Sequence, residues 1–170
     1  MKLALAADHA GFELKTSVGR MLADAGHETV DCGCHGLEPV DYLDPTLALV
    51  QAMVSGGCER GICLCGNGYA MAMLANRFPG IRAAVCHDSF SARTVVEMGA
   101  ANVISIGARV VGKELALELV EMWLASKFRS GVERYARRLE RLEALERELV
   151  VPEWRSILAR HSGRGRAPSS

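Results

Sequence analysis

The chain has 170 residues, and its 20 basic side chains balance 20 acidic ones, so its formal net charge is zero. At this length we expect one compact domain that buries roughly 70% of the surface of the unfolded chain. The neutral charge gives no global field to attract nucleic acid or an anionic membrane, and no apolar run reaches the ~20 residues of a membrane helix, so we expect neither partner.

Short apolar runs alternate with longer helical patterns along most of the chain. This alternation predicts a parallel sheet with helices on both faces. The predicted strands cover residues 2–7, 27–31, 61–65, 82–86 and 102–106, and the predicted helices cover residues 11–25, 45–55, 68–76, 89–98 and 113–126. We therefore expect an α/β fold, a Rossmann-like three-layer sandwich with a five-stranded parallel sheet.

The composition shifts to Glu, Arg and Leu from about Gly131 onward, with leucines at three- and four-residue spacing: Leu139, Leu142, Leu145 and Leu149. This spacing predicts an amphipathic helix, which could pack on its own domain or on a second subunit. We expect the domain to cover residues 1–150, including this helix as a dimer element. Residues 151–170 are expected to form a short helix followed by a polar, disordered tail from Arg160.

The sequence shows no pattern typical of an export signal, so we expect a cytoplasmic location, where the six cysteines would be reduced thiols. Cys32, Cys34 and His35, together with Cys63 and Cys65, could suggest zinc. Their spacing does not match the C-x-x-C knuckle of structural zinc sites, and apolar strands usually hold cysteine as a small buried hydrophobe. We therefore predict no metal site.

The segment from Cys65 to Gly68 follows the third predicted strand and leads directly into a helix. Backbone N–H groups of such a turn can bind a phosphate or an oxyanion. A dinucleotide loop is disfavoured, because G-x-G alone is a weak signal and this one follows the third strand instead of the first. The helix start would favour a Cys65 thiolate, a base or nucleophile, although an inert buried cysteine fits the pattern equally well.

Two further pairs of residues could serve the same site. Asp8 and His9 follow the first strand, at the edge where ligands of parallel sheets bind. The carboxylate of Asp8 could orient a hydroxyl, and His9 could donate a hydrogen bond to phosphate. They could equally be a helix cap and a packing histidine. Arg134 and Arg138 are four residues apart and share a helix face, which suits one phosphate but also an ordinary solvated surface.

Several blocks of residues occur in one order and together resemble the type B ribose-5-phosphate isomerases and galactose-6-phosphate isomerase subunits. The blocks are ADHAGFELK (7–15), VDY (40–42), CGNG (65–68) with AN (75–76), GIRAA (80–84) with CHD (86–88), SAR (91–93), and ANV (101–103) with GARV (107–110). The resemblance extends over residues 1–139. It implies a homodimer, or a tetramer, with active sites shared between subunits.

The resemblance also implies a metal-free, cofactor-free interconversion of aldose and ketose phosphates through a cis-enediolate. Cys65 would move the proton between carbons, and Asp8 would assist between oxygens, with Asn67 at a third catalytic position. The backbone of Gly66, Gly68, Tyr69 and Ala70 would hold the enediolate. The remaining substrate-binding residues implied are His9, Tyr42, Gly99, Arg109, Arg134 and Arg138, of which Arg134 and Arg138 would reach in from the partner subunit.

Two positions depart from the family pattern. Met98 stands where the family has a histidine that opens the cyclic sugar, and Asn67 stands where it has a threonine. Methionine cannot donate a proton, and relatives that lack this histidine act on tetroses, so an acyclic substrate such as a tetrose 4-phosphate is one hypothesis. The others are ordinary ribose 5-phosphate isomerisation and a sugar-phosphate-binding or structural subunit without catalysis.

Overall fold

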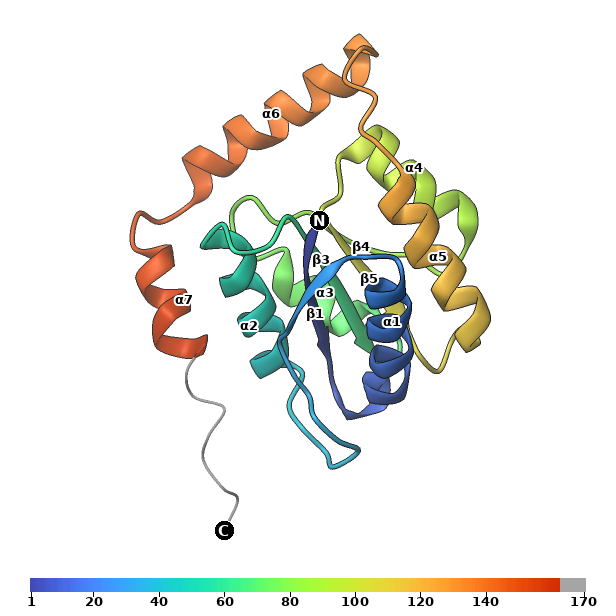
Figure 1. Cartoon of the computed structure of the whole chain (residues 1–170). Helices are drawn as coiled ribbons and strands as arrows, with labels where there is room; N and C mark the ends of the chain where they lie inside the picture. The colour runs from blue at the N-terminus through green and yellow to red at the C-terminus, as the bar shows by residue number, and fades with distance from the viewer. Residues whose placement is uncertain (163–170) are drawn as a thin grey trace.

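Five strands, β1 (Lys2–Ala7), β2 (Glu28–Asp31), β3 (Arg60–Cys65), β4 (Ala83–Val85) and β5 (Val103–Gly107), form one parallel sheet in the order β2-β1-β3-β5-β4 (Figure 1). Ala7 pairs with Leu64, and Cys65 pairs with Gly107. This register places the carboxyl ends of β1, β3 and β5 side by side. The predicted fold class is confirmed.

The computed structural model describes residues 1–162. Its helices are η1 (His9–Gly11), α1 (Phe12–Asp24), α2 (Leu43–Val54), α3 (Tyr69–Ala75), α4 (Ser89–Gly99), α5 (Lys113–Ala125), α6 (Glu133–Leu149) and α7 (Trp154–Ser162). The prediction of a disordered tail from Arg160 was wrong for residues 160–162, because α7 continues to Ser162 and its Leu158 is buried against the domain. The rest of that predicted tail lies outside the described residues.

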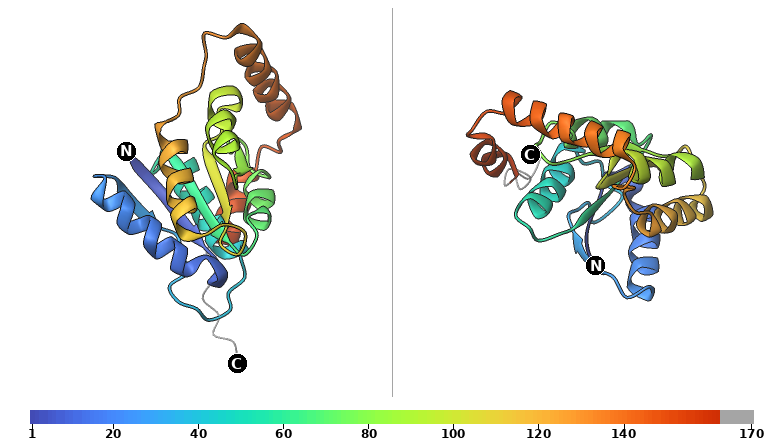
Figure 2. Two further views of the ribbon diagram at one scale, coloured as in Figure 1. Left: turned by 90° about the vertical axis from the view of Figure 1, so that its right-hand side faces the viewer. Right: turned by 90° about the horizontal axis from the view of Figure 1, so that it is seen from above.

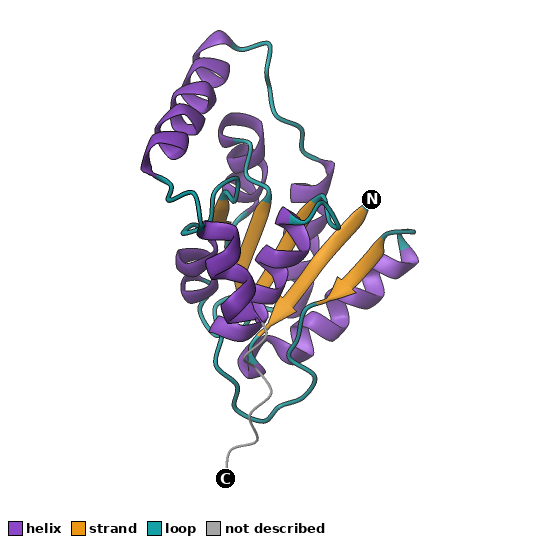
Figure 3. Cartoon of the chain, turned by 90° about the vertical axis from the view of Figure 1, so that its left-hand side faces the viewer, coloured by secondary structure: helices purple, strands orange, loops and turns teal. Residues whose placement is uncertain are grey.

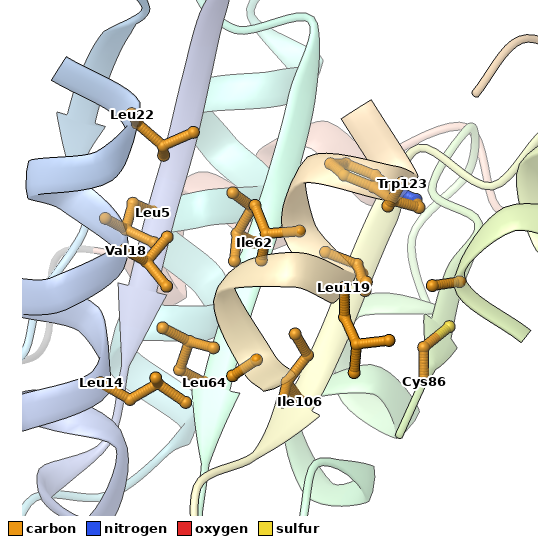
Figure 4. Packing of buried hydrophobic residues seen from close by; sticks show 14 of the residues in the cluster. Leu5, Leu14, Val18, Leu22, Ile62, Leu64, Cys86, Ile106, Leu119 and Trp123 are labelled. Atoms are coloured by element: carbon orange, nitrogen blue, oxygen red, sulfur yellow. The ribbon is translucent and has the colours of Figure 1, made fainter. Parts of the chain in front are cut away.

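Each face of the sheet has its own apolar core. Helices α1, α4 and α5 cover one face, where Leu5, Val18, Ile62, Leu119 and Trp123 belong to a single cluster (Figure 4). Helices α2, α3 and α7 cover the other face. Strand β3 alternates between the two clusters, since a strand buried on both sides directs successive side chains to opposite faces.

Helix α6 crosses the end of the domain where the strands begin, as Figure 2 and Figure 3 show. Few polar contacts attach it: the Gly80 amide donates to Glu146 Oε2 at 2.9 Å, and Arg82 pairs with Glu143 at 3.9 Å. In the segment before the helix, the Arg129 amide donates to the Glu97 carbonyl at 3.0 Å. Its leucine stripe is largely exposed, with Leu142 51%, Leu145 54% and Leu149 81% exposed, and it lines a pocket together with Phe78 and Pro79. None of the helices in residues 1–162 is both long and apolar enough to span a membrane.

Candidate active site

The turn that follows β3 encloses the Cys65 thiol. Cys65 is only 1% exposed, and the Gly68 amide donates to its Sγ at 3.2 Å. Gly68 adopts φ +87°, a left-handed conformation that favours glycine. The buried Ser105 hydroxyl donates to the Gly68 carbonyl at 2.5 Å, and His87 Nε2 accepts from the Gly107 amide at 2.9 Å. The turn is therefore held in place by hydrogen bonds that involve Ser105 of β5 and His87 in the segment after β4.

Two close backbone approaches join this turn to its neighbours. A Cβ on Gly11 would lie 2.1 Å from the Leu64 carbonyl oxygen, and one on Gly107 would lie 2.7 Å from the Asn67 carbonyl carbon. Only glycine permits these distances. The ends of β1, β3 and β5 thus meet at one place, as the sequence predicted from the rule for parallel sheets.

Asp8 and His9 lie at this meeting point. Asp8 Oδ1 accepts from the amides of Ala10 at 2.9 Å and Gly11 at 3.0 Å, so Asp8 is a helix cap, the structural role considered above. The capping bonds use one carboxylate oxygen. His9 Nδ1 accepts from the Val40 amide at 3.3 Å, which leaves Nε2 to carry the hydrogen of the neutral ring and to donate it.

The other predicted residues of this edge surround the turn. The Arg109 amide donates to the Gly66 carbonyl at 3.0 Å, and a Cβ on Gly66 would lie 3.7 Å from Arg109 Cδ. Asn67 is exposed, with Oδ1 4.0 Å from the Cys65 Sγ. Tyr69 and Ala70 begin α3, and Tyr42 occupies the N-cap of α2, where the loop from β2 returns to the domain.

The chain does not bring three of the predicted residues to this edge. Gly99 ends α4, which runs back toward the start of β5, so Gly99 and Met98 lie at the opposite edge of the sheet from Cys65. Arg134 and Arg138 lie in the first turns of α6, beside that same edge. Arg134 is exposed and stacks over the ring of Tyr135, 4.8 Å from its centroid.

Most of the remaining cysteines are surrounded by apolar side chains. Burial raises the pKa of Cys32 to about 12 and that of Cys86 to about 11, and it also raises the pKa values of Cys58 and Cys63. These four thiols therefore stay protonated near neutral pH. Within residues 1–162, no group of three or more His, Cys, Asp or Glu side chains is arranged to hold a metal ion.

Three residues that the sequence analysis did not select support the site. Ser105 interrupts an otherwise apolar strand, and His87 directly follows a strand, so both carried a recognisable signal. Lys15 is only 4% exposed and occupies the apolar stripe of α1 with Val18 and Leu22, at spacings of three and seven residues. A charged residue in such a stripe indicates a buried polar partner.

Comparison with known proteins is consistent with this geometry. Residues 3–142 match the family model described as Ribose/Galactose Isomerase. Ribose-5-phosphate isomerase B of Escherichia coli is 37% identical over 145 residues, which are 85% of this chain and 96% of that protein. D-erythrulose-4-phosphate isomerase of Pectobacterium atrosepticum is 39% identical over 133 residues, 77% of this chain and 87% of that protein.

Among solved structures, ribose-5-phosphate isomerase B of Clostridium thermocellum superposes with a TM-score of 0.84 and 41% sequence identity. The match covers 88% of this chain and all of that one.

Proposed function

This chain belongs to the ribose/galactose isomerase family, and from that premise we propose that it is a sugar-phosphate isomerase that interconverts an aldose and a ketose through a cis-enediolate. The observation that carries the proposal is the Cys65 thiol, enclosed by the backbone turn that precedes α3. A base and a set of N–H donors at one place are what proton transfer next to a carbonyl requires.

In the proposed reaction, the Cys65 thiolate takes the proton from the carbon next to the carbonyl. The electron pair of that C–H bond forms the enediolate, whose oxygens the amides of Gly66 to Ala70 stabilise. The resulting thiol returns the proton to the former carbonyl carbon, while the free carboxylate oxygen of Asp8 assists transfer between the two oxygens. Asn67, beside Sγ, completes the proposed catalytic set.

The phosphate is proposed to bind to His9 and Arg109 of one chain and to Arg134 and Arg138 of a second chain. Arg134 and Arg138 lie at the far edge of the sheet from Cys65 in their own chain, so they cannot contact the same substrate there. A homodimer with shared sites resolves this separation and also covers exposed apolar residues beside the turn, such as Tyr69, Met73 and Phe90. Tyr42 and the partner's Gly99 would complete the sugar pocket.

We favour a tetrose 4-phosphate as the substrate. The thioether of Met98 cannot protonate a ring oxygen, so a cyclic sugar would open slowly. In a tetrose 4-phosphate the phosphate blocks the oxygen that would close the ring, and no opening step is needed. The relative named D-erythrulose-4-phosphate isomerase shares 39% identity with this chain, which supports the same substrate class.

The deciding experiment measures turnover of erythrulose 4-phosphate, ribose 5-phosphate and galactose 6-phosphate by the purified protein, with Cys65→Ala as the control. We expect turnover of the tetrose above that of both cyclic sugars, and a kcat about 1,000-fold lower in the control. Equal turnover of ribose 5-phosphate and the tetrose would overturn the acyclic-substrate proposal. Binding without any turnover would instead indicate a subunit that lacks catalysis.

We further propose that residues 1–150 form the catalytic domain and that the protein is cytoplasmic. The six cysteines are all unpaired, as expected of thiols kept reduced inside the cell.

A further inference from the structure

We propose that Lys15 is a positioning residue: its buried ammonium group holds the loop of residues 32–42 so that Tyr42 and His9 face the substrate. This inference rests on the proposed function for its effect on turnover, but the contacts that support it are independent of the reaction. The loop joins β2 to α2 and lies at the carboxyl edge of the sheet, below the strands in Figure 1.

Lys15 reaches the loop from the buried side of α1. Its Nζ donates to Asp31 Oδ1 at 2.5 Å and to the Cys34 carbonyl at 2.6 Å. Asp31 ends β2, and its Oδ1 also accepts from the Gly33 amide at 2.9 Å. One ammonium group thus joins the last residue of the strand to the first turn of the loop.

The loop in turn contacts residues of the site. The Ala7 amide donates to the Gly33 carbonyl at 2.7 Å, and the Cys34 amide donates to the Ala7 carbonyl at 2.7 Å, which extends the pairing of β1 to Ala7, the residue before Asp8. Farther along, the Val40 amide donates to His9 Nδ1 at 3.3 Å. This bond selects the ring form that presents a hydrogen on Nε2.

An ammonium group suits this position better than a neutral side chain. It supplies several hydrogens from one atom, so it can satisfy a carboxylate and a backbone carbonyl together. With a side chain such as methionine, the buried Cys34 carbonyl and Asp31 would both lose that donor. The first turn of the loop would then be held by its backbone bonds to Ala7 and by the bond from the Gly33 amide to Asp31, and Tyr42 would be less firmly positioned.

The proposed role concerns binding and not the proton transfer itself. Lys15 supports the loop, which contains Tyr42 and contacts His9. Cys65 and the turn after it are held by β5, through strand pairing and through the Ser105 hydroxyl. Loss of the ammonium group should therefore raise KM and leave kcat nearly unchanged. A variant that merely destabilised the whole domain would not separate the two constants in this way.

The test compares Lys15→Met with Lys2→Met in the full chain. Lys2 is a matched control, because it also pairs with a carboxylate, Glu28 at 2.7 Å, but its side chain is 43% exposed and lies at the amino edge of the sheet. We expect Lys15→Met to raise the KM for erythrulose 4-phosphate about 10- to 100-fold, since small displacements of binding groups have effects of this size. Lys2→Met should change neither constant.

Hydrogen exchange of backbone amides supplies a readout that needs no substrate. Lys15→Met should accelerate exchange in residues 32–42 and leave the amides of residues 65–70 protected as in the unmodified protein. Unchanged exchange in the loop, or equal acceleration in both segments, would overturn the role of Lys15. Faster exchange in the loop alone, in a protein that turns over no sugar phosphate, would support that role and reject the proposed function.

Two further variants keep the test decisive. If Lys15→Met does not fold, Lys15→Gln retains a polar donor at shorter reach and is measured in the same way. Tyr42→Ala combined with Lys15→Met should raise KM no more than the worse single variant, because both act through the same loop. If the factors by which the two substitutions raise KM multiply in the double variant, the substitutions act independently and the proposal is contradicted.

Discussion

The two edges of the sheet carry different kinds of functional residue. At the carboxyl edge, Cys65 is buried in a turn that backbone hydrogen bonds and close glycine contacts hold in place. At the amino edge, Arg134 and Arg138 are exposed on α6, which few polar contacts attach to the domain. We call the carboxyl edge the rigid edge and the amino edge the exposed edge. The rigid edge is suited to proton transfer, which requires short fixed distances, and the exposed edge is suited to binding charge on another molecule.

The largest effect is expected at the rigid edge. Cys65→Ala should lower kcat about 1,000-fold, because a positioned acid-base group contributes roughly 10²- to 10⁴-fold. Activity of the purified variant on erythrulose 4-phosphate measures this. Cys86→Ala is the matched control, since Cys86 is equally buried but belongs to the core cluster on the other face of the sheet (Figure 4). A similar kcat loss in both variants would argue against a special role of Cys65.

The exposed edge should affect binding more than turnover. Arg138→Ala should raise KM about 10- to 100-fold, since a charged hydrogen bond contributes roughly 1.5–3 kcal/mol. Arg141→Ala, three residues farther along the same helix and also exposed, should leave KM unchanged.

Mixing the two edges tests whether subunits share sites. Chains with Cys65→Ala and chains with Arg138→Ala, unfolded and refolded together in equal amounts, should regain about one quarter of the unmodified activity, measured at a substrate concentration well below the KM of the unmodified protein. Half of the dimers are then mixed, and each mixed dimer has one intact site and one doubly defective site. If the activity of the mixture at this substrate concentration does not exceed the average of the two separate variants, each site is built from one chain.

The tight packing at the carboxyl edge should also appear in stability. Gly11→Ala should lower the free energy of unfolding by about 1–3 kcal/mol, because its Cβ would overlap the Leu64 carbonyl oxygen. Gly131→Ala, where a Cβ meets open space before α6, should change it by less than about 0.5 kcal/mol. Denaturant titration of both variants measures the difference, and equal values would show that the close approach relaxes freely.

A smaller, selective gain is expected from Met98→His at the amino edge. A histidine there can donate a proton to a ring oxygen, so kcat/KM for ribose 5-phosphate should rise up to about tenfold. The value for erythrulose 4-phosphate should not change, because that substrate has no ring to open. An equal rise for both sugars would mean that the histidine acts elsewhere in the reaction.

The smallest effect concerns pH. Burial alone would raise the pKa of Asp31, but the hydrogen bonds from Lys15 and the Gly33 amide lower that pKa below its ordinary value. The ionised carboxylate therefore stabilises the fold fully above the ordinary pKa of about 3.9, and this contribution is lost as the pH falls through the lowered value. Asp31→Asn should reduce the dependence of the free energy of unfolding on pH in this acidic range, as measured by denaturant titration at a series of pH values. An unchanged acid slope would contradict this contribution.

The sequence predicted the rigid edge well and the exposed edge only by resemblance. The turn from Cys65 to Gly68 and the residues Asp8 and His9 follow strands, so their common location follows from a rule about parallel sheets. No such rule applies to Arg134 and Arg138, since their spacing places them on one helix face but does not place that helix relative to the sheet. The position of α6 depends on contacts such as that between Gly80 and Glu146, which are distant in the sequence.

By itself, the sequence determined which segments become strands and helices and which thiol lies at a strand end beside backbone donors. These features depend on residues that are close along the chain, so local patterns predict them. Only the tertiary structure decided that Lys15 reaches Asp31 and the Cys34 carbonyl, that His87 and Ser105 support the turn, and that Arg134 lies across the sheet from Cys65. Such contacts depend on how distant segments pack, which no spacing along the chain encodes.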